Sequence, residues 1–302
     1  MSEINRPNLF IVGAPKTGTS AMYQWLGDHP YIYMSPAKEP HYFATDLNSF
    51  RACSTEASYQ HLFAKANAHH RWVGEASKMY MFSEVAIEKL KSYSPDARLI
   101  VMLRNPVELV YSFHHHLLFL RHETVEDFER AWNLQEARLR GEKLPRGIEG
   151  ARRLQYKEVG MIGARLKRVL HLFGDRHVCI IFFENFKEDP RKAYQKVLAF
   201  LGLNDHGLKD FSPVNRSKTN RVPWLTEFLR KKPWPVSFLY NTMRRFTGLR
   251  GFGIGNRILE MQTKKQKRNA LSSPFKEKLR NVFEKDIELL EHLTSRNLDH
   301  WR

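Results

Sequence analysis

The sequence predicts an α/β protein: a single domain with a mostly parallel central sheet, flanked by helices, and a P-loop-like phosphate-binding turn. The chain has 302 residues, of which 42% are apolar, enough for one large domain with a sizeable core. Short apolar runs alternate along it with segments whose apolar residues have helical spacing. A turn containing glycine joins the first run to the first helix. Such alternation is typical of parallel sheets with right-handed crossovers.

The stretch 9–20, LFIVGAPKTGTS, carries the central motif. Residues 9–12 predict a buried strand and 13–18 a tight turn, and from Thr19 the apolar spacing becomes helical. This arrangement aims backbone N–H groups and the positive end of a helix dipole at one point, where Lys16 adds a full charge. The predicted phosphate cradle consists of Ala14, Pro15, Lys16, Thr17, Gly18, Thr19 and Ser20.

The turn departs from the nucleoside-triphosphate loop GxxxxGK[ST]. Gly13 and Gly18 fit its spacing, but Thr19 stands where the lysine belongs, and the cation is Lys16, inside the turn. This departure argues against ordinary triphosphate chemistry with magnesium. A glycine turn that joins strand to helix without any ligand remains an alternative for this stretch alone.

A second anion site is predicted after the apolar run 98–103, RLIVML. Arg104 follows this strand directly, and a helix over 106–120 begins with a proline, which suits the first helical turn. Open parallel sheets bind ligands at the carboxyl ends of their strands, so Arg104 and Ser112 can converge on one anion. A buried ion pair for Arg104 and a simple helix-filling role for Ser112 are the alternatives.

The segment 38–43, KEPHYF, follows a strand predicted over 31–34 and combines an ammonium, a carboxylate and an imidazole within four residues. These groups suit acid–base chemistry. In an extended chain the side chains of Glu39 and His41 face the same way, toward one site. Four interpretations are open on these residues: Glu39 as the base with His41 orienting it, the reverse assignment, a merely polar loop, and a surface ion pair of Glu39 with Lys38 or another cation.

The other elements follow the same patterns of apolar spacing, capping residues and terminating glycines. Further strands are predicted over 72–75 and 177–183, and helices over 83–93 with Ser83 as N-cap, 124–140, 164–173, 190–201 and 274–293. Histidines occupy 114–116, where consecutive positions on a helix point in three directions. That spacing does not suit a metal site, so we interpret them as helix surface and pocket lining.

The net charge of +17 implies acidic ligands, nucleic acid or an anionic surface. No zinc-finger, RRM or homeodomain pattern is present, so nucleic acid is not expected as a partner and anionic small molecules or polyanionic acceptors fit better. The sequence has two cysteines, no apolar run of membrane-spanning length and no signal-peptide core. A soluble, cytoplasmic, basic protein without a bound metal is the expectation, and its oligomeric state is not predicted.

A basic loop over 212–224 can fold over an anionic ligand, although charged loops are more often only solvated. Its candidate ligand-binding residues are Arg216, Ser217, Lys218, Thr219, Asn220 and Arg221. The segment 222–270 mixes aromatic residues with basic clusters. It is a candidate for covering an acceptor site, for weak contact with an anionic membrane surface, or for a mobile arm.

Together these motifs resemble the sulfotransferases that use 3′-phosphoadenosine-5′-phosphosulfate, and most of all their bacterial branch, which is related to the heparan-sulfate type. GAPKTGTS at 13–20 resembles the loop for the 5′-phosphosulfate, and LRNPVELVYS at 103–112 resembles the 3′-phosphate motif. KEPHYF at 38–43 resembles the segment with the proposed catalytic Glu and His, and NRSKTNR at 215–221 the loop that closes over the nucleotide. The resemblance makes residues 1–302 one sulfotransferase domain.

The resemblance implies metal-independent, in-line transfer of a sulfuryl group to a hydroxyl or amine of a carbohydrate or other small metabolite, with adenosine 3′,5′-bisphosphate as product. Lys16 would stabilise the leaving phosphate, and Glu39, helped by His41, would remove the acceptor's proton. Lys78 stands where relatives often have Pro, and Ile162 where many have Tyr. No role is assigned to these two positions.

Two other functions compete with this interpretation. An ATP-dependent small-molecule kinase needs a lysine after Gly18 and a metal-binding Asp after a strand, and neither is evident. A non-enzymatic polyanion-binding protein would account for the charge. It does not explain why Lys16, Glu39 and Arg104 each follow the end of a predicted strand.

Overall fold

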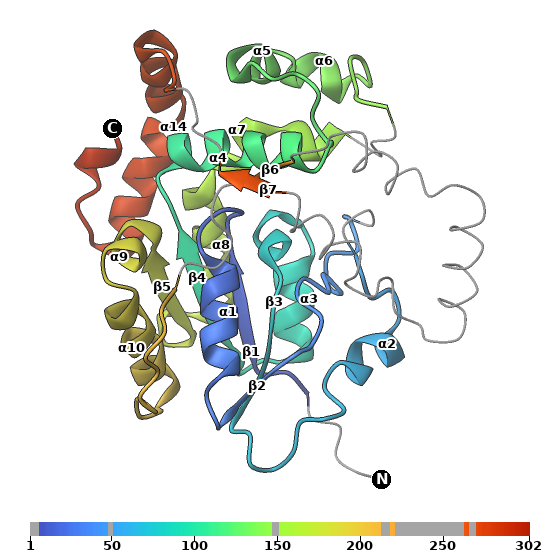
Figure 1. The fold of residues 1–302 in the computed structure, drawn as a ribbon, viewed down its shortest axis with the longest axis vertical. Helices are drawn as coiled ribbons and strands as arrows, with labels where there is room; N and C mark the ends of the chain where they lie inside the picture. Colours follow the sequence, from blue (N-terminus) through green and yellow to red (C-terminus); the bar gives the residue numbers. More distant parts are fainter. Residues whose placement is uncertain (1–5, 48–50, 147–150, 213–217, 221–262, 266–269) are drawn as a thin grey trace.

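The computed structural model describes residues 6–47, 51–146, 151–212, 218–220, 263–265 and 270–302. Five strands form one parallel sheet in the order β2-β3-β1-β4-β5 (Figure 1). The strands are β1 (Leu9–Gly13), β2 (Ile32–Met34), β3 (Trp72–Ala76), β4 (Arg98–Leu103) and β5 (Val178–Phe182). The predicted α/β single domain is therefore confirmed, and each predicted strand differs from the observed one by at most one residue at either end.

The central strands are buried on both faces, which explains why they read as continuous apolar runs rather than as alternating patterns. In β1, Leu9 and Ile11 pack into one hydrophobic cluster, whereas Phe10 and Val12 pack into another on the opposite face. The sheet thus separates two apolar layers, and helices must cover both.

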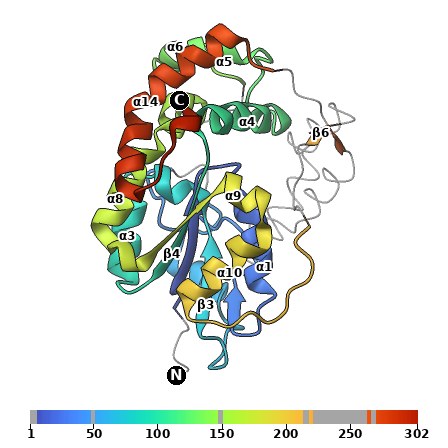
Figure 2. The same ribbon diagram turned by 90° about the vertical axis from the view of Figure 1, so that its left-hand side faces the viewer.

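Helices α1 (Thr19–Gly27) and α10 (Pro190–Leu201) cover one face of the sheet, and α3 (Ala86–Tyr93), α8 (Ile162–Phe173) and α14 (Ser273–Thr294) cover the other (Figure 2). The predicted helices over 164–173, 190–201 and 274–293 correspond to α8, α10 and α14. No helix in the described part of the chain is both long and apolar enough to cross a membrane.

Helix α4 (Pro106–Phe119) follows β4 and lies beyond the carboxyl ends of the strands (Figure 2). Asn105 fixes its start, because Asn105 Oδ1 accepts the backbone N–H of Val107 at 2.9 Å. The remaining elements are short. They are α2 (Glu56–His61), α5 (Phe128–Asn133), α6 (Gln135–Leu139), α7 (Tyr156–Gly160), α9 (Phe183–Glu188), the antiparallel pair β6 (Lys218–Asn220) and β7 (Thr263–Lys265), and the 3-10 turns Lys78–Phe82, Ala151–Leu154, Asp175–His177 and Asp299–Trp301.

The single helix predicted over 124–140 is wrong, because the structure has α5 and α6 there instead. Glu123 accounts for the late start: its Oε1 accepts the backbone N–H groups of the next two residues, at 2.8 and 2.9 Å, and holds them out of a helix. The Glu123 carboxylate is itself fixed by a fully buried ion pair with Arg138 at 2.7 Å. Helix α5 begins only where Asp127 caps it.

The expectation that Ser83 is the N-cap of a helix over 83–93 is also wrong, because α3 begins at Ala86. The Ser83 hydroxyl still accepts the backbone N–H of Ala86, at 2.9 Å, and it donates to Asp46 Oδ1 at 2.5 Å. Asp46 therefore holds the Ser83 hydroxyl in place. This hydroxyl accepts a hydrogen bond from the first N–H group of the helix, which lies three residues further along the chain.

Candidate active site

The turn after β1 has the tight backbone that a phosphate cradle requires. Lys16 and Gly18 have φ values of 67° and 90°, in the left-handed region. A Cβ at Gly18 would lie 2.7 Å from the ring of Phe186, so only glycine fits there. The hydroxyl of Thr17 closes the turn by donating to Ala14 O at 2.7 Å.

Helix α1 begins directly after this turn, with Gly18 as an N-cap that offers no side-chain oxygen. The N–H groups of the first helical turn have no acceptor within a helix, and they point out of its N-terminus. Thr19 and Ser20 therefore direct their amides toward the turn that carries Lys16. The predicted cradle residues come together in one turn of small residues, one cation and a helix N-terminus.

Arg104 leaves the carboxyl end of β4 beside this turn. Its Nη1 donates to the carbonyl oxygen of Lys16 at 3.2 Å, and its guanidinium lies over the ring of Phe183, 4.7 Å from the centroid. Arg104 Nη2 also lies 3.4 Å from Oε2 of Glu108, one helical turn further along the chain, and the Glu108 side chain is about half exposed. The cation predicted for a second anion is thus held against the turn that carries Lys16.

Ser112 lies on α4 with only 1% of its surface exposed. Among the hydrogen bonds of the described residues, none joins Ser112 to Arg104, so their convergence on one anion stays a prediction. The strand β6 formed by Lys218, Thr219 and Asn220 contacts α4. Arg216, Ser217 and Arg221, and most of the segment 222–270, lie outside the described residues.

Glu39 is at the centre of a charged cluster beyond the end of β3. Lys78 Nζ contacts both of its carboxylate oxygens, at 2.7 and 2.8 Å. Lys38 Nζ contacts Oε1 at 3.0 Å, and His41 Nε2 lies 3.5 Å from Oε2. The side chains of Lys38, Glu39 and Lys78 are all between 19% and 26% exposed, and that of His41 is 3% exposed.

The cluster holds Glu39 ionised and His41 neutral at neutral pH. Burial acts to raise the pKa of Glu39, but Lys78, the hydrogen bond from His41 and Lys38 outweigh it and keep this pKa well below its usual 4.5. Burial lowers the pKa of His41 although Glu39 is adjacent. An ionised carboxylate therefore stands beside a neutral imidazole.

The extended backbone expected for the segment 38–43 is wrong. Glu39 and His41 have φ values of 63° and 49°, in the left-handed region that residues with side chains rarely adopt. The predicted meeting of their side chains nevertheless occurs, through a compact turn rather than an extended chain. Outliers of this kind cluster at functional sites, where the surrounding structure holds the strain.

Reasoning from the sequence gave Lys78 no role and gave His116 only a general one. Lys78 was noticed only as a departure from the family pattern, and its contact with Glu39 joins segments far apart in the chain. His116 was interpreted, with the two histidines before it, as helix surface and pocket lining, and its position agrees with the pocket-lining part. Burial first, and then the charges of Lys78 and Lys16, lower its pKa to about 3, so its ring lies near both cations.

Helical spacing could have singled out His116, because it lies one turn after Ser112, on the same side of α4. Unlike His116, His114 is part of the core. Its Nε2 lies 2.8 Å from Val125 O, and none of its surface is exposed. The interpretation of His114 as a residue of the helix surface is therefore wrong.

Comparison with known proteins identifies the family of the chain. The family described as "Sulfotransferase domain" matches residues 6–289. The chain belongs to the sulfotransferase domain family. A crystal structure of a sulfotransferase from Alicyclobacillus acidocaldarius superposes with a TM-score of 0.72 at 28% sequence identity, and the match covers 98% of this chain and 99% of that one.

Curated relatives of this sulfotransferase-family chain include two carbohydrate-modifying proteins. Bifunctional heparan sulfate N-deacetylase/N-sulfotransferase 4 of Mus musculus is 26% identical over 204 residues, which cover 66% of this chain and 23% of the relative. Carbohydrate sulfotransferase 15 of Homo sapiens is 24% identical over 284 residues, which cover 76% of this chain and 50% of the relative. The match spans about a quarter of the first relative's length and half of the second's.

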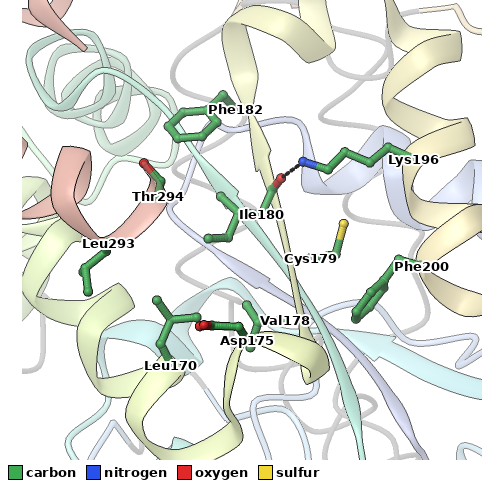
Figure 3. A pocket seen from close by; sticks show the side chains of 10 residues that line it. All are labelled: Leu170, Asp175, Val178, Cys179, Ile180, Phe182, Lys196, Phe200, Leu293 and Thr294. Carbon is green, nitrogen blue, oxygen red and sulfur yellow. Dashed lines mark hydrogen bonds between the residues drawn. The ribbon is translucent and has the colours of Figure 1, made fainter. Parts of the chain in front are cut away.

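One pocket of this sulfotransferase domain lies outside the candidate active site. A hollow of about 390 Å³ runs along the outer edge of β5, on the far side of β4 from the Glu39 cluster (Figure 3). Lys196 crosses it and donates to the carbonyl oxygen of Ile180 at 2.9 Å, so a lysine covers part of the exposed strand edge.

Within the described residues, no group of three or more His, Cys, Asp or Glu is arranged to hold a metal ion.

Proposed function

We propose that this chain transfers a sulfuryl group from 3′-phosphoadenosine-5′-phosphosulfate to a hydroxyl or amine of an acceptor. One observation carries the proposal: three neighbouring strands, β3, β1 and β4, end at the same edge of the sheet. The Glu39 cluster lies at the end of the first, where Glu39 N donates to Ala76 O and Lys78 follows the strand. The Lys16 turn follows the second strand, and Arg104 follows the third. The proposed base Glu39, the proposed phosphate-binding turn with Lys16, and Arg104, the cation proposed for a second phosphate, thus lie at neighbouring strand ends.

The residues fit such a donor. The amides of residues 14–20 and the ammonium of Lys16 would hold the 5′-phosphosulfate, because a helix N-terminus and a tight turn of small residues suit an oxyanion. Arg104 and Ser112 would hold the 3′-phosphate. The basic loop residues Arg216, Ser217, Lys218, Thr219, Asn220 and Arg221 would close over the nucleotide.

The reaction is an in-line displacement at sulfur. A bond forms between the acceptor oxygen or nitrogen and sulfur, while the bond from sulfur to the bridging oxygen of the 5′-phosphate breaks. The acceptor's proton passes to the Glu39 carboxylate, which Lys78 and His41 orient. Charge that develops on the leaving phosphate is met by Lys16 and the amides of the turn, and positioned cations of this kind make a metal unnecessary.

The acceptor is proposed to be a carbohydrate or other small metabolite, because the relatives named above modify heparan sulfate or carbohydrate. We further propose that residues 1–302 act as one sulfotransferase domain in the cytoplasm, without nucleic acid as a partner. The basic, aromatic segment 222–270 is assigned to the acceptor side or to weak contact with an anionic membrane surface.

The test is to incubate the protein with ³⁵S-labelled donor and a panel of hydroxyl and amine acceptors, separating the products by chromatography. We expect labelled acceptor and adenosine 3′,5′-bisphosphate in equal amounts, with no loss of rate in EDTA. Transfer of ³²P from ATP that stops in EDTA and returns with magnesium would instead support the kinase. Binding of heparin-like polyanions with no transfer from either donor would favour a non-enzymatic polyanion binder.

A further inference from the structure

Glu75 is a buried carboxyl group for which the proposed reaction has no direct use. It lies on β3, beside Phe10 of β1, and none of its surface is exposed. Three hydroxyl groups donate to it: Ser77 Oγ to Oε2 at 2.5 Å, Tyr80 Oη to Oε1 at 2.6 Å and Tyr59 Oη to Oε1 at 3.1 Å. A carboxyl group in the core is costly unless its oxygens are satisfied, and here three donors satisfy them.

Two of the three donors also hold the backbone of the segment 38–43. Ser77 Oγ accepts the N–H of His41 at 3.1 Å, and Tyr80 Oη accepts the N–H of Phe43 at 3.5 Å. A further bond, from Glu39 N to Ala76 O at 2.9 Å, ties the same segment to the end of β3. Alternate amides of the segment are therefore anchored next to Glu75.

The third donor supports the segment through its ring. Tyr59 stacks on Tyr42, with ring centroids 4.4 Å apart and planes inclined by 12°, and it meets Phe43 edge-on at 5.4 Å. Each hydroxyl that Glu75 orients thus belongs to a residue that contacts the segment 38–43. This is the segment whose left-handed φ values at Glu39 and His41 require support from the surrounding structure.

We propose that Glu75 is a positioning residue of the sulfuryl-transfer site, which fixes Glu39 and His41 through Ser77, Tyr80 and Tyr59 without touching either substrate. A carboxylate has acceptor capacity for all three hydroxyls at once, and a carboxamide oxygen does not. Burial raises the pKa of Glu75 to about 7 against the effect of its three donors. The inference rests on the proposed function.

The variants Glu75→Gln and Ser77→Ala test the proposal, with Tyr93→Phe as the matched control. Tyr93 packs against Phe43, with ring centroids 5.2 Å apart, but it is not among the hydroxyl donors to Glu75. We expect kcat to fall about 10²-fold in Glu75→Gln and Ser77→Ala, because a misplaced catalytic group costs about that much. KM for the donor and affinity for adenosine 3′,5′-bisphosphate should be unchanged, and Tyr93→Phe should retain full kcat.

The double variant separates positioning from general damage. If Glu75 acts through Ser77, combining the two substitutions should lower kcat little more than either alone. Equal losses of kcat and donor affinity in Glu75→Gln, or multiplicative losses in the double variant, would overturn the proposal.

Hydrogen exchange provides a readout that does not depend on sulfuryl transfer. The amides of His41 and Phe43 should exchange at least tenfold faster in Glu75→Gln, while those of β4 and all amides of Tyr93→Phe stay unchanged. Unchanged exchange at 41–43 would refute the positioning role even in a fully active protein. If the wild type transfers no sulfuryl group but exchange rises as expected, the proposed function fails while the structural role of Glu75 stands.

Discussion

Replacing Lys78 by Met should make Glu39 easier to protonate. The ammonium of Lys78 contacts both carboxylate oxygens of Glu39, and of the groups that lower the pKa of Glu39 it has the largest effect. A hydrogen bond to a charged group contributes about 1.5–3 kcal/mol, and one pKa unit corresponds to about 1.4 kcal/mol. The pKa of Glu39 should therefore rise by about one to two units in Lys78→Met, since methionine keeps the apolar stem but not the charge.

The direction of the pH effect follows from the role of the base. Glu39 accepts a proton only when ionised, so the rate falls as pH drops through its pKa. Single-turnover rates at saturating donor should show an acid limb displaced upward by about one to two pH units in Lys78→Met, when each profile is scaled to that protein's own rate above pH 8. Lys38→Met is the matched control, because Lys38 makes one contact at 3.0 Å and should give a smaller displacement. An unchanged acid limb in Lys78→Met, or a larger displacement in Lys38→Met, would refute the reasoning.

Three further predictions concern Arg104, Lys16 and Glu75. Arg104→Ala should abolish a preference of about 10–150-fold for adenosine 3′,5′-bisphosphate over adenosine 5′-phosphate, measured by calorimetry; a retained preference would contradict the assignment. Lys16→Ala should lower the saturating single-turnover rate more than donor affinity, because its charge matters most in the transition state; a normal rate with weakened donor binding would reduce Lys16 to a binding residue. The raised pKa of Glu75 contributes stability that is present below pH 4.5 and is lost as pH rises through about 7. From pH 4 to 8 the free energy of unfolding of the wild type, measured in urea, should therefore fall by about 3 kcal/mol relative to that of Glu75→Gln. A difference between the two proteins that does not change with pH would contradict this prediction.

Much of the fold could be predicted because local signals and tertiary packing agree. β4 and α10 have the predicted bounds, since a continuous apolar run and a helix closed by Gly202 leave little choice. The turn after β1 was equally visible, because Gly13 and Gly18 bound it between a buried strand and a helix.

The failures have a common physical cause, which is contact between distant segments. The helix predicted over 124–140 begins late, at Phe128, because a buried pair between Glu123 and Arg138 places a carboxylate where it captures two backbone amides. Local helical propensity does not include that competition. Lys78 was left without a role because only the fold brings it to Glu39.

The geometry of the segment 38–43 was unpredictable for the same reason. Nothing in its residue types favours left-handed backbone at Glu39 and His41. The anchoring atoms belong to Ala76 and Ser77, at the end of a strand more than thirty positions away. The meeting of the two side chains was correctly expected, but for an extended chain that the structure does not contain.

The central claim is that Glu39 takes the acceptor's proton at a site built for a phosphosulfate donor. The most direct measurement is the single-turnover rate of ³⁵S transfer by Glu39→Gln at saturating donor, with bisphosphate affinity measured on the same sample. Glutamine keeps the size of the side chain but removes the base, so the rate should fall about 10²–10⁴-fold while affinity stays nearly normal. A variant that keeps more than about three tenths of the wild-type rate would contradict the claim, and would move the proton to His41 or to His116.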